Sequence, residues 1–269
     1  MFVTDGGSTA GAGDAFRGQH RRPAAAWLTV LLAAVLHLPG CSPPPPEADA
    51  ETVVLVHGLG RTRVSMALLG SRLGEAGYRV VNIGYPSTRA TMEENVATLR
   101  AKLQACCPAP ERVHFVTHSM GGIVVRRYLA EHSPAHQGRV VMLSPPSRGS
   151  EVVDAFSDSP LLQRLLGPSG AALGTDSASI PNRLGPARFE LGVIAGNRSV
   201  SPISSWLIPG PDDGKVAVAR ARVEDAAFLV VPATHSFIMN RPDVAREVVT
   251  FLRTGRFSRP ELPDSADAG

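Results

Sequence analysis

A serine flanked by small residues follows an apolar run in Phe115-Val116-Thr117-His118-Ser119-Met120-Gly121-Gly122. A helix-like segment, 123–131, follows at once, so the pattern predicts a tight strand-to-helix turn that exposes the Ser119 hydroxyl at the top of a sheet. Gly121 fits such a turn, because a Cβ there would collide with the neighbouring strand. The N-terminus of the following helix would aim backbone N–H groups at the same point, which suits a developing negative charge. Ser119 is therefore a candidate nucleophile, and a plain helix cap is the alternative.

A serine hydroxyl needs a base to take its proton and a carboxylate to orient that base. After Ser119 the histidines are His132, His136 and His235. The first two come just after the expected helix, whereas His235 follows the apolar strand 228–231 at the start of a loop. Where a nucleophile sits in such a strand-to-helix turn, the order along the chain is serine, acid, histidine. We therefore expect His235 to be the base.

The acid is harder to choose from the residues alone. Most carboxylates between Ser119 and His235 lie in polar or helix-like stretches and are expected to face solvent. Asp212 and Asp213 differ, because they lie in Ile208-Pro209-Gly210-Pro211-Asp212-Asp213-Gly214-Lys215-Val216. Pro and Gly on both sides permit a sharp reversal that presents a side chain. An ordinary Asp-Gly turn is the alternative.

An oxyanion-binding loop is expected early in the chain. A strand of β-branched and apolar residues, 53–56, ends in His57-Gly58-Leu59-Gly60. The glycines let the backbone turn tightly near the serine, so the N–H groups of Leu59 and Met120 could meet at one oxygen. A phosphate-binding loop is disfavoured, because neither a full GxGxxG nor a GxxxxGK[ST] motif is present. His57 itself is expected to be a structural hydrogen-bonding residue.

Taken together, these motifs resemble the α/β-hydrolase superfamily, and within it bacterial lipases and esterases with a His-Gly oxyanion loop and a His-Ser-Met-Gly-Gly elbow. The resemblance covers roughly residues 51–257. Similar triacylglycerol lipases take their acid from an Asn-Asp-Gly-hydrophobic run, which implies Asp213 here. Two positions depart from the family pattern: Thr117 stands where Gly is usual, and Lys215 where a hydrophobic residue is usual.

The resemblance implies a serine hydrolase that cleaves carboxylic esters through an acyl-enzyme, with an ester or lipid as substrate. An acyltransferase or thioesterase of the same fold, or a non-catalytic lipid-binding relative, is the alternative. Similar lipases can bind calcium through an Asp two residues after the histidine, but this chain has Phe237 there. We therefore expect no metal and no cofactor. Acyl length, alcohol moiety, the choice between lipase and esterase, and oligomeric state stay open.

The elements that must position these residues alternate along the chain. Apolar runs predict strands at 53–56, 79–83, 113–117, 139–143, 191–195 and 228–231, and helices at 64–76, 91–105, 123–131 and 244–252. This order implies an α/β fold with a mostly parallel central sheet flanked by helices. The serine, acid and histidine would then lie at the carboxyl ends of strands, where such folds bind ligands.

A segment at about 147–188 breaks the alternation, and we interpret it as a small cap or lid over Ser119. It contains a short helix candidate at 160–166 among Gly, Ser and Pro. Its leucines either line an apolar acyl pocket or simply pack on the core. They are Leu161, Leu162, Leu165 and Leu166.

Composition fits one globular domain with a sizeable core, since 43% of 269 residues are hydrophobic and 19% are charged. The formal net charge is +3, and no basic block is dense enough to predict nucleic-acid binding. Cys106 and Cys107 end a predicted helix before Pro108, and we expect two thiols, because a disulfide between adjacent residues closes a strained ring. Their redox state stays open.

The N-terminal segment, 1–40, is interpreted as a signal peptide. Arginines precede an apolar run of 15 residues, 24–38, which is short for a membrane span. Leu38-Pro39-Gly40-Cys41-Ser42 resembles a bacterial lipobox, which implies acylation of Cys41 and an outer-membrane lipoprotein held on the bilayer. A secreted or periplasmic protein is the alternative. Residues 41–50 would form a Pro-rich tether, 51–257 the hydrolase domain and 258–269 a tail.

Overall fold

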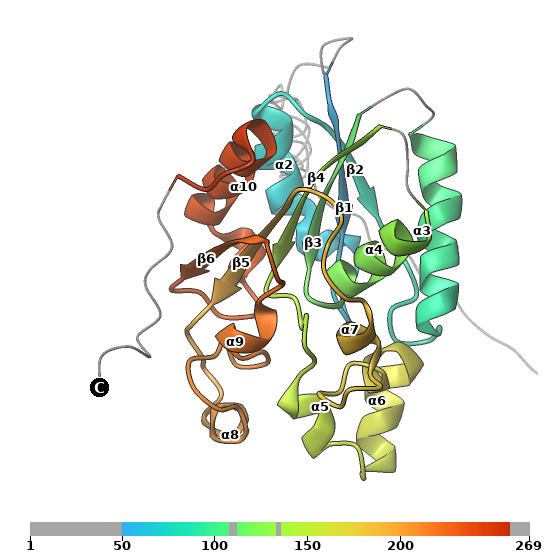
Figure 1. Cartoon of the computed structure of the whole chain (residues 1–269), viewed down its shortest axis with the longest axis vertical. Helices are drawn as coiled ribbons and strands as arrows, with labels where there is room; N and C mark the ends of the chain where they lie inside the picture. The colour runs from blue at the N-terminus through green and yellow to red at the C-terminus, as the bar shows by residue number, and fades with distance from the viewer. Residues whose placement is uncertain (1–49, 108–111, 133–135, 259–269) are drawn as a thin grey trace, which may run out of the picture. The chain divides into compact units, whose positions relative to one another are not determined.

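Six parallel strands form a single sheet in the order β2-β1-β3-β4-β5-β6 (Figure 1). The computed structural model describes residues 50–107, 112–132 and 136–258. The strands are β1 (Thr52–Val56), β2 (Arg79–Ile83), β3 (Val113–His118), β4 (Gln137–Leu143), β5 (Leu191–Gly196) and β6 (Ala227–Val231). The strand order steps outward from β1 in both directions, so the crossover helices must cover both faces of the sheet.

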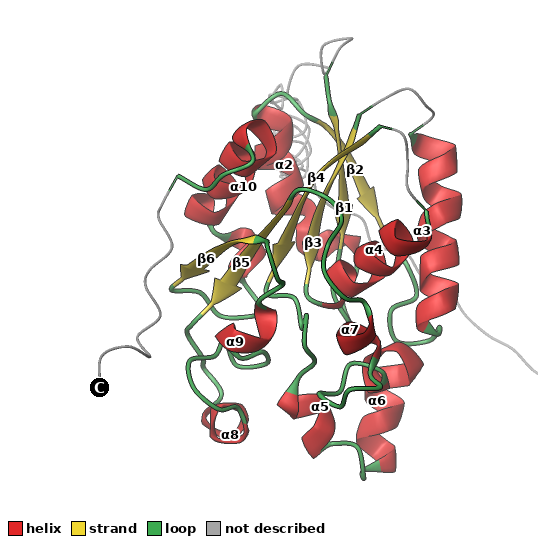
Figure 2. Cartoon of the chain, in the orientation of Figure 1, coloured by secondary structure: helices red, strands yellow, loops and turns green. Residues whose placement is uncertain are grey.

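Helices cover the two faces in pairs (Figure 2). On one face lie α2 (Ala67–Glu75) and α10 (Pro242–Thr254), and on the other lie α3 (Met92–Cys106) and α4 (Met120–Glu131). Alternate residues of β1 point to opposite faces: Val53 and Leu55 pack with α2 and α10, whereas Val54 and Val56 pack with α3 and α4. Because both faces are buried, β1 is an uninterrupted apolar run, as parallel central strands are.

The predicted elements and the fold class are confirmed, with small shifts at the ends. All six predicted strands are present within one or two residues of the expected bounds. The predicted helix 64–76 divides into a short 3-10 helix, η1 (Arg63–Met66), and α2. Thr91 begins α3 with a capping box to Glu94, which fixes where that helix starts.

Short helices gather beyond the carboxyl ends of the strands. The cap segment contains α5 (Glu151–Ala155), α6 (Pro160–Ala171) and α7 (Ile180–Arg183), and α6 is kinked at Gly167, whose φ is 67°. Two further short helices, α8 (Pro202–Leu207) and α9 (Val218–Ala221), lie between β5 and β6, and η2 (Ile238–Asn240) precedes α10. The helical pattern at 160–166 predicted only the first half of α6, and the other short helices were not predicted, because they have too few turns for a periodic signal.

The predicted signal peptide, Cys41 and nearly all of the tether and tail lie outside the described residues. Within the described part of the chain, no helix is both long and apolar enough to cross a membrane.

Candidate active site

Ser119 lies in a strained turn between β3 and α4. Its φ of 52° and ψ of −128° are unusual for a residue with a Cβ. Two backbone hydrogen bonds hold the turn: Ser119 N–H donates to Leu143 O at 2.8 Å, and Gly122 N–H donates to Ser119 O at 2.9 Å. A Cβ on Gly121 would lie 2.5 Å from Val56 O, so only glycine fits there, as the sequence predicted.

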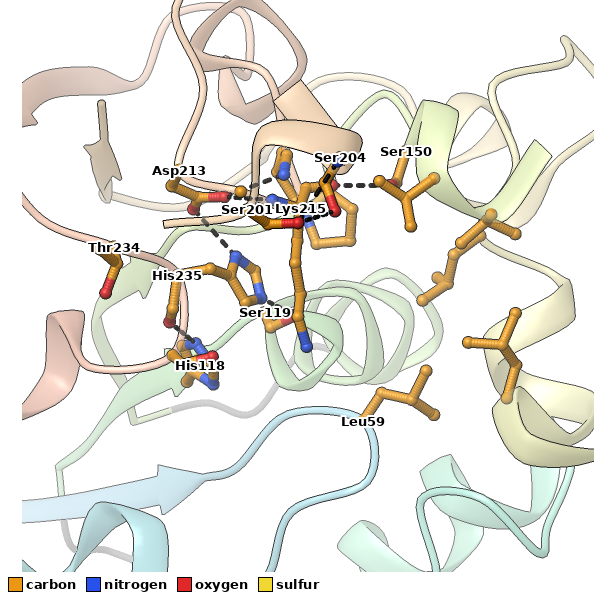
Figure 3. A pocket seen from close by; sticks show the side chains of 18 of the residues that line it. Leu59, His118, Ser119, Ser150, Ser201, Ser204, Asp213, Lys215, Thr234 and His235 are labelled. Carbon is orange, nitrogen blue, oxygen red and sulfur yellow. Dashed lines mark hydrogen bonds and ion pairs between the residues drawn. The ribbon is translucent and has the colours of Figure 1, made fainter. Parts of the chain in front are cut away.

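The His235 imidazole lies between Ser119 and Asp213 (Figure 3). Its Nε2 is 3.0 Å from Ser119 Oγ, and its Nδ1 is 2.9 Å from Asp213 Oδ2. An ionised carboxylate only accepts hydrogen bonds, so Nδ1–H donates to Asp213 and Nε2 keeps the lone pair that can accept the Ser119 O–H. The three side chains therefore form a hydrogen-bonded series of alcohol, imidazole and carboxylate.

Asp213 is held in place by backbone groups. Its Oδ1 accepts from Lys215 N–H at 3.0 Å and from Val216 N–H at 2.9 Å, and its carbonyl accepts from His235 N–H at 2.9 Å. Burial by itself raises the pKa of Asp213, but the adjacent His235 and the hydrogen bonds outweigh burial and lower that pKa. The carboxylate is therefore ionised at neutral pH.

Of the two neighbouring aspartates, only Asp213 contacts His235. Asp212 Oδ1 instead accepts from Ser205 Oγ at 3.0 Å and from Gly214 N–H at 2.6 Å, which stabilises the turn itself. The chain returns to β5 here, since a Cβ on Gly196, the last residue of that strand, would lie 3.0 Å from Asp213 Cβ. Asp213 thus lies beside a strand that ended many residues earlier in the sequence.

His118 supports the other side of His235. Its Nε2–H donates to His235 O at 2.9 Å, and the two ring centroids are 4.9 Å apart. The ring is buried, so desolvation first, and the nearby His235 second, lower the pKa of His118 well below its ordinary value. His118 is therefore a neutral positioning residue. No sequence motif predicted this role, because only the fold places His118 next to His235.

The His57-Gly58-Leu59 loop lies against the serine. A Cβ on Gly58 would lie 2.9 Å from Ser119 Cβ, so glycine is required for this close approach. Leu59 N–H has no hydrogen-bond partner among the described residues, and Met120 is the first residue of α4, where N–H groups lack an acceptor one turn earlier. His57 is tied to the loop: its Nδ1–H donates to Gly58 O at 2.9 Å, and its ring stacks on Tyr85.

A cavity of about 450 Å³ opens over Ser119 and His235. The cap lines one side of it with apolar side chains: Val152, Val153, Phe156, Leu165, Leu166 and Leu173. Of the leucines singled out in α6, Leu165 and Leu166 line the cavity, whereas Leu161 is 76% exposed and does not. The side chain of Leu162 lies outside the described set. The leucines of α6 therefore divide between the cavity and the surface.

Two other sequence expectations concern thiols and metals. Cys106 ends α3 and Cys107 follows it, and their Sγ atoms are 2.6 Å apart, farther than the S–S bond of a disulfide. In the described ranges, no three His, Cys, Asp or Glu side chains lie close enough together to hold a metal ion. Phe237, at the position where calcium-binding relatives have Asp, is 61% exposed and lines the cavity.

Comparisons with known proteins agree with this architecture. A family model described as "Alpha/beta hydrolase family" matches residues 53–256. The mature lipase BlEst2 of Bacillus licheniformis is similar in structure, with a TM-score of 0.62 and 24% identity, covering 75% of this chain and 91% of that one. Phospholipase PlaB of Legionella pneumophila has a TM-score of 0.59 at 16% identity, covering 76% of this chain and 57% of that one. At such identities the likeness shows the fold.

A curated human protein, the lysosomal thioesterase PPT2 of Homo sapiens, is 29% identical over 135 residues. The match covers 48% of this chain and 45% of that protein, so the chain matches less than half of the relative's length. The family model, in contrast, spans most of this chain, from β1 to the end of α10. The chain belongs to the alpha/beta hydrolase family, as the motifs around Ser119 predicted.

Proposed function

We propose that this protein is a serine hydrolase that cleaves carboxylic esters through an acyl-enzyme. The observation that carries the proposal is the pair of contacts at His235, 3.0 Å to Ser119 Oγ and 2.9 Å to Asp213 Oδ2. The Ser119 side chain does not cap α4, because its hydroxyl makes no hydrogen bond to the backbone at the start of that helix. The family, its lipase and esterase neighbours and the apolar cavity support an ester or lipid as substrate.

In the proposed reaction, Ser119 Oγ attacks the ester carbonyl carbon while His235 Nε2 takes the hydroxyl proton. Asp213 holds Nδ1–H and stabilises the imidazolium that forms. The N–H groups of Leu59 and Met120 bind the oxyanion. His235 then gives its proton to the leaving alcohol, and the acyl group stays on Ser119. Water, deprotonated by His235, releases the acid and restores the serine.

The deciding experiment replaces Ser119 with alanine. Wild-type protein should hydrolyse p-nitrophenyl esters and react with a fluorophosphonate probe, because an activated serine oxygen attacks the probe's phosphorus and displaces fluoride. Ser119→Ala should abolish both, a loss of about 10⁴-fold or more in rate. Labelling that survives the substitution contradicts the assignment of the nucleophile, and folded wild-type protein that neither turns over nor labels supports a non-catalytic binding role.

A thioesterase is the second candidate, and the human relative described as a lysosomal thioesterase favours it. The same serine chemistry cleaves both bonds, so the leaving group decides between them. Matched pairs of an oxygen ester and a thioester with one acyl chain would measure the preference directly. An added alcohol that captures the acyl group faster than water does would instead indicate an acyltransferase.

We also propose that Cys41 carries a lipid anchor, because the residues before it are similar to a lipobox. The bacterial cell envelope, with the outer membrane preferred, is the corresponding location. Metabolic labelling with a radioactive or alkyne-bearing fatty acid should tag wild-type protein and fail to tag Cys41→Ala. Release of unlabelled wild-type protein into the medium would favour secretion instead.

A further inference from the structure

Two cationic side chains face the active-site cavity. Arg61 and Lys215 both line it. The carboxylate in the lining is Asp213, which is buried and engaged by His235. Neither cation has an ion-pair or side-chain hydrogen-bond partner within the part of the chain that the structure describes. The cavity therefore presents two cationic side chains that form no ion pair with a carboxylate of the described residues, and Asp213 is already paired with His235.

Lys215 is held firmly at its backbone. Its N–H donates to Asp213 Oδ1 at 3.0 Å, and its carbonyl accepts from Ser150 Oγ at 2.7 Å. One bond ties it to the acid of the proposed triad, and the other ties it to the start of the cap. Its side chain extends from this anchored position into the cavity, toward Ser119 (Figure 3). Lys215 occupies a position at which similar lipases usually have a hydrophobic residue.

The two charges act on each other. Partial desolvation first, and the Arg61 guanidinium second, lower the pKa of Lys215, whereas Asp213 opposes them. The positive charge of Arg61 therefore disfavours the charged form of Lys215. An anion bound beside both would relieve this repulsion, which gives a substrate with a negative group an advantage that a neutral ester lacks.

We propose that Arg61 and Lys215 form an anion subsite that selects amphiphilic esters bearing a carboxylate or phosphate near the scissile bond. The inference rests on the proposed function of the same cavity. The apolar side chains of the cap, with Phe156 and Leu166 among them, would take the acyl chain. The anionic group would lie on the opposite side, at the turn that carries Asp213. The substrate class is thus narrower than neutral esters.

Matched substrates test this selectivity and distinguish the two anions. O-Hexanoylglycolate against propyl hexanoate places a carboxylate on the alcohol side, next to the scissile bond. 1-Hexanoylglycerol 3-phosphate against 1-hexanoylglycerol places a phosphate on the alcohol side. For wild-type protein we expect kcat/KM to be about tenfold higher for the anionic member of at least one pair, chiefly because KM is lower. This preference should shrink as the salt concentration rises from 0.05 to 0.5 M.

Variants then assign the preference to the cations. Lys215→Met and Arg61→Gln should each lower the anionic-to-neutral ratio by roughly fivefold, whereas Lys215→Arg should keep it. The matched controls are Lys102→Met, which removes the chain's other lysine from the exposed side of α3, and Arg63→Gln, two residues from Arg61. A wild-type enzyme without preference in either pair, or a Lys215→Met variant that loses both substrates equally, overturns the proposal.

A binding measurement separates this inference from the hydrolysis proposal. Ser119→Ala protein titrated calorimetrically with 1-hexanoylglycerol 3-phosphate should bind it several-fold more tightly than 1-hexanoylglycerol, and the added Lys215→Met change should remove the difference. If wild-type protein turns over no ester but this difference is found, hydrolysis fails and the anion subsite stands. If the two compounds bind equally and neutral esters are turned over, hydrolysis stands and the anion subsite fails.

Discussion

The loops that hold Ser119, Asp213 and His235 differ sharply from the cap that faces them. His235 is 5% exposed and Asp213 is 2% exposed, and each is fixed by several hydrogen bonds. Across the cavity, Leu165 of α6 is 70% exposed. The three side chains of the candidate site are therefore held mostly buried by hydrogen bonds, whereas part of the cap surface that faces the cavity is exposed.

This contrast separates chemistry from selectivity. A change among the buried groups should lower the rate by orders of magnitude or lower the free energy of unfolding by some kcal/mol. The reason is that it leaves a buried polar group without its partner or forces the backbone to shift. A change in the cap should alter which substrate is preferred and leave the reaction itself intact. Substitutions of buried groups and of cap residues test this division.

The largest effect is expected at Asp213. Asp213→Asn should lower kcat/KM about 10⁴-fold, because an amide that donates to Nδ1 forces the tautomer in which Nε2 cannot accept the serine proton. Asp212→Asn is the control, since its side-chain oxygen can still accept from Ser205 and Gly214. Steady-state hydrolysis of a p-nitrophenyl ester measures kcat/KM of both variants. A larger loss in Asp212→Asn than in Asp213→Asn would identify Asp212 as the acid.

The second effect is on stability. In Gly121→Ala the new Cβ would lie 2.5 Å from Val56 O and 2.6 Å from His57 O, so backbone must shift, at a cost of about 1–3 kcal/mol in the free energy of unfolding. Gly74→Ala in α2 meets nothing within 4 Å, and should stabilise by roughly 0.5–1 kcal/mol. Urea unfolding of the two variants gives the comparison. Equal stability would mean that the turn has room for a Cβ.

The third effect is on the pH dependence of stability. His118 has a lowered pKa in the folded protein, so below about pH 6.5 the unfolded chain binds a proton that the folded chain does not. Stability should therefore fall as pH falls from about 6.5 toward the lowered pKa, by up to about 1.4 kcal/mol per pH unit for this group. His118→Gln should remove that contribution.

Urea unfolding between pH 5 and 8 compares the two proteins. His57 and His114, whose pKa values burial also lowers, keep a slope of the same sign in the variant. Below pH 6.5, the free energy of unfolding should rise with pH more steeply for the wild type than for His118→Gln. The difference in slope should correspond to at most one bound proton, and above pH 6.5 the slopes should be equal. Identical slopes would show that His118 is protonated equally in both states.

The smallest effect is expected in the cap, between two leucines of α6. Leu166→Ala should lower kcat/KM for a hexanoyl ester relative to an acetyl ester by roughly fivefold, because about 1 kcal/mol of apolar contact with the longer chain is lost. Leu161→Ala should leave the ratio unchanged, since that side chain points away from the cavity. A change at Leu161 as large as at Leu166 would mean that α6 moves when substrate binds.

Local sequence patterns were enough to predict the architecture. Runs of apolar residues predicted every strand of the sheet. Gly121 predicted the tight turn at Ser119, because only a residue without a Cβ fits there. Ser119 and His235 could be selected because chain order and the ends of strands limit the choices. All of these signals lie within short windows of sequence, where local geometry decides.

Other features depended on residues that meet only in the folded chain. The contact of Asp213 with His235, which only the family resemblance had implied, joins segments separated by many residues. So do the support of His235 by His118 and the placement of Lys215 and Arg61 in one cavity. Side-chain direction within a turn and the angle at which a cap crosses a sheet leave no periodic trace in the sequence. The sequence therefore determined the sheet and its candidate nucleophile, and tertiary packing decided which side chains contact His235 and which charges line the cavity.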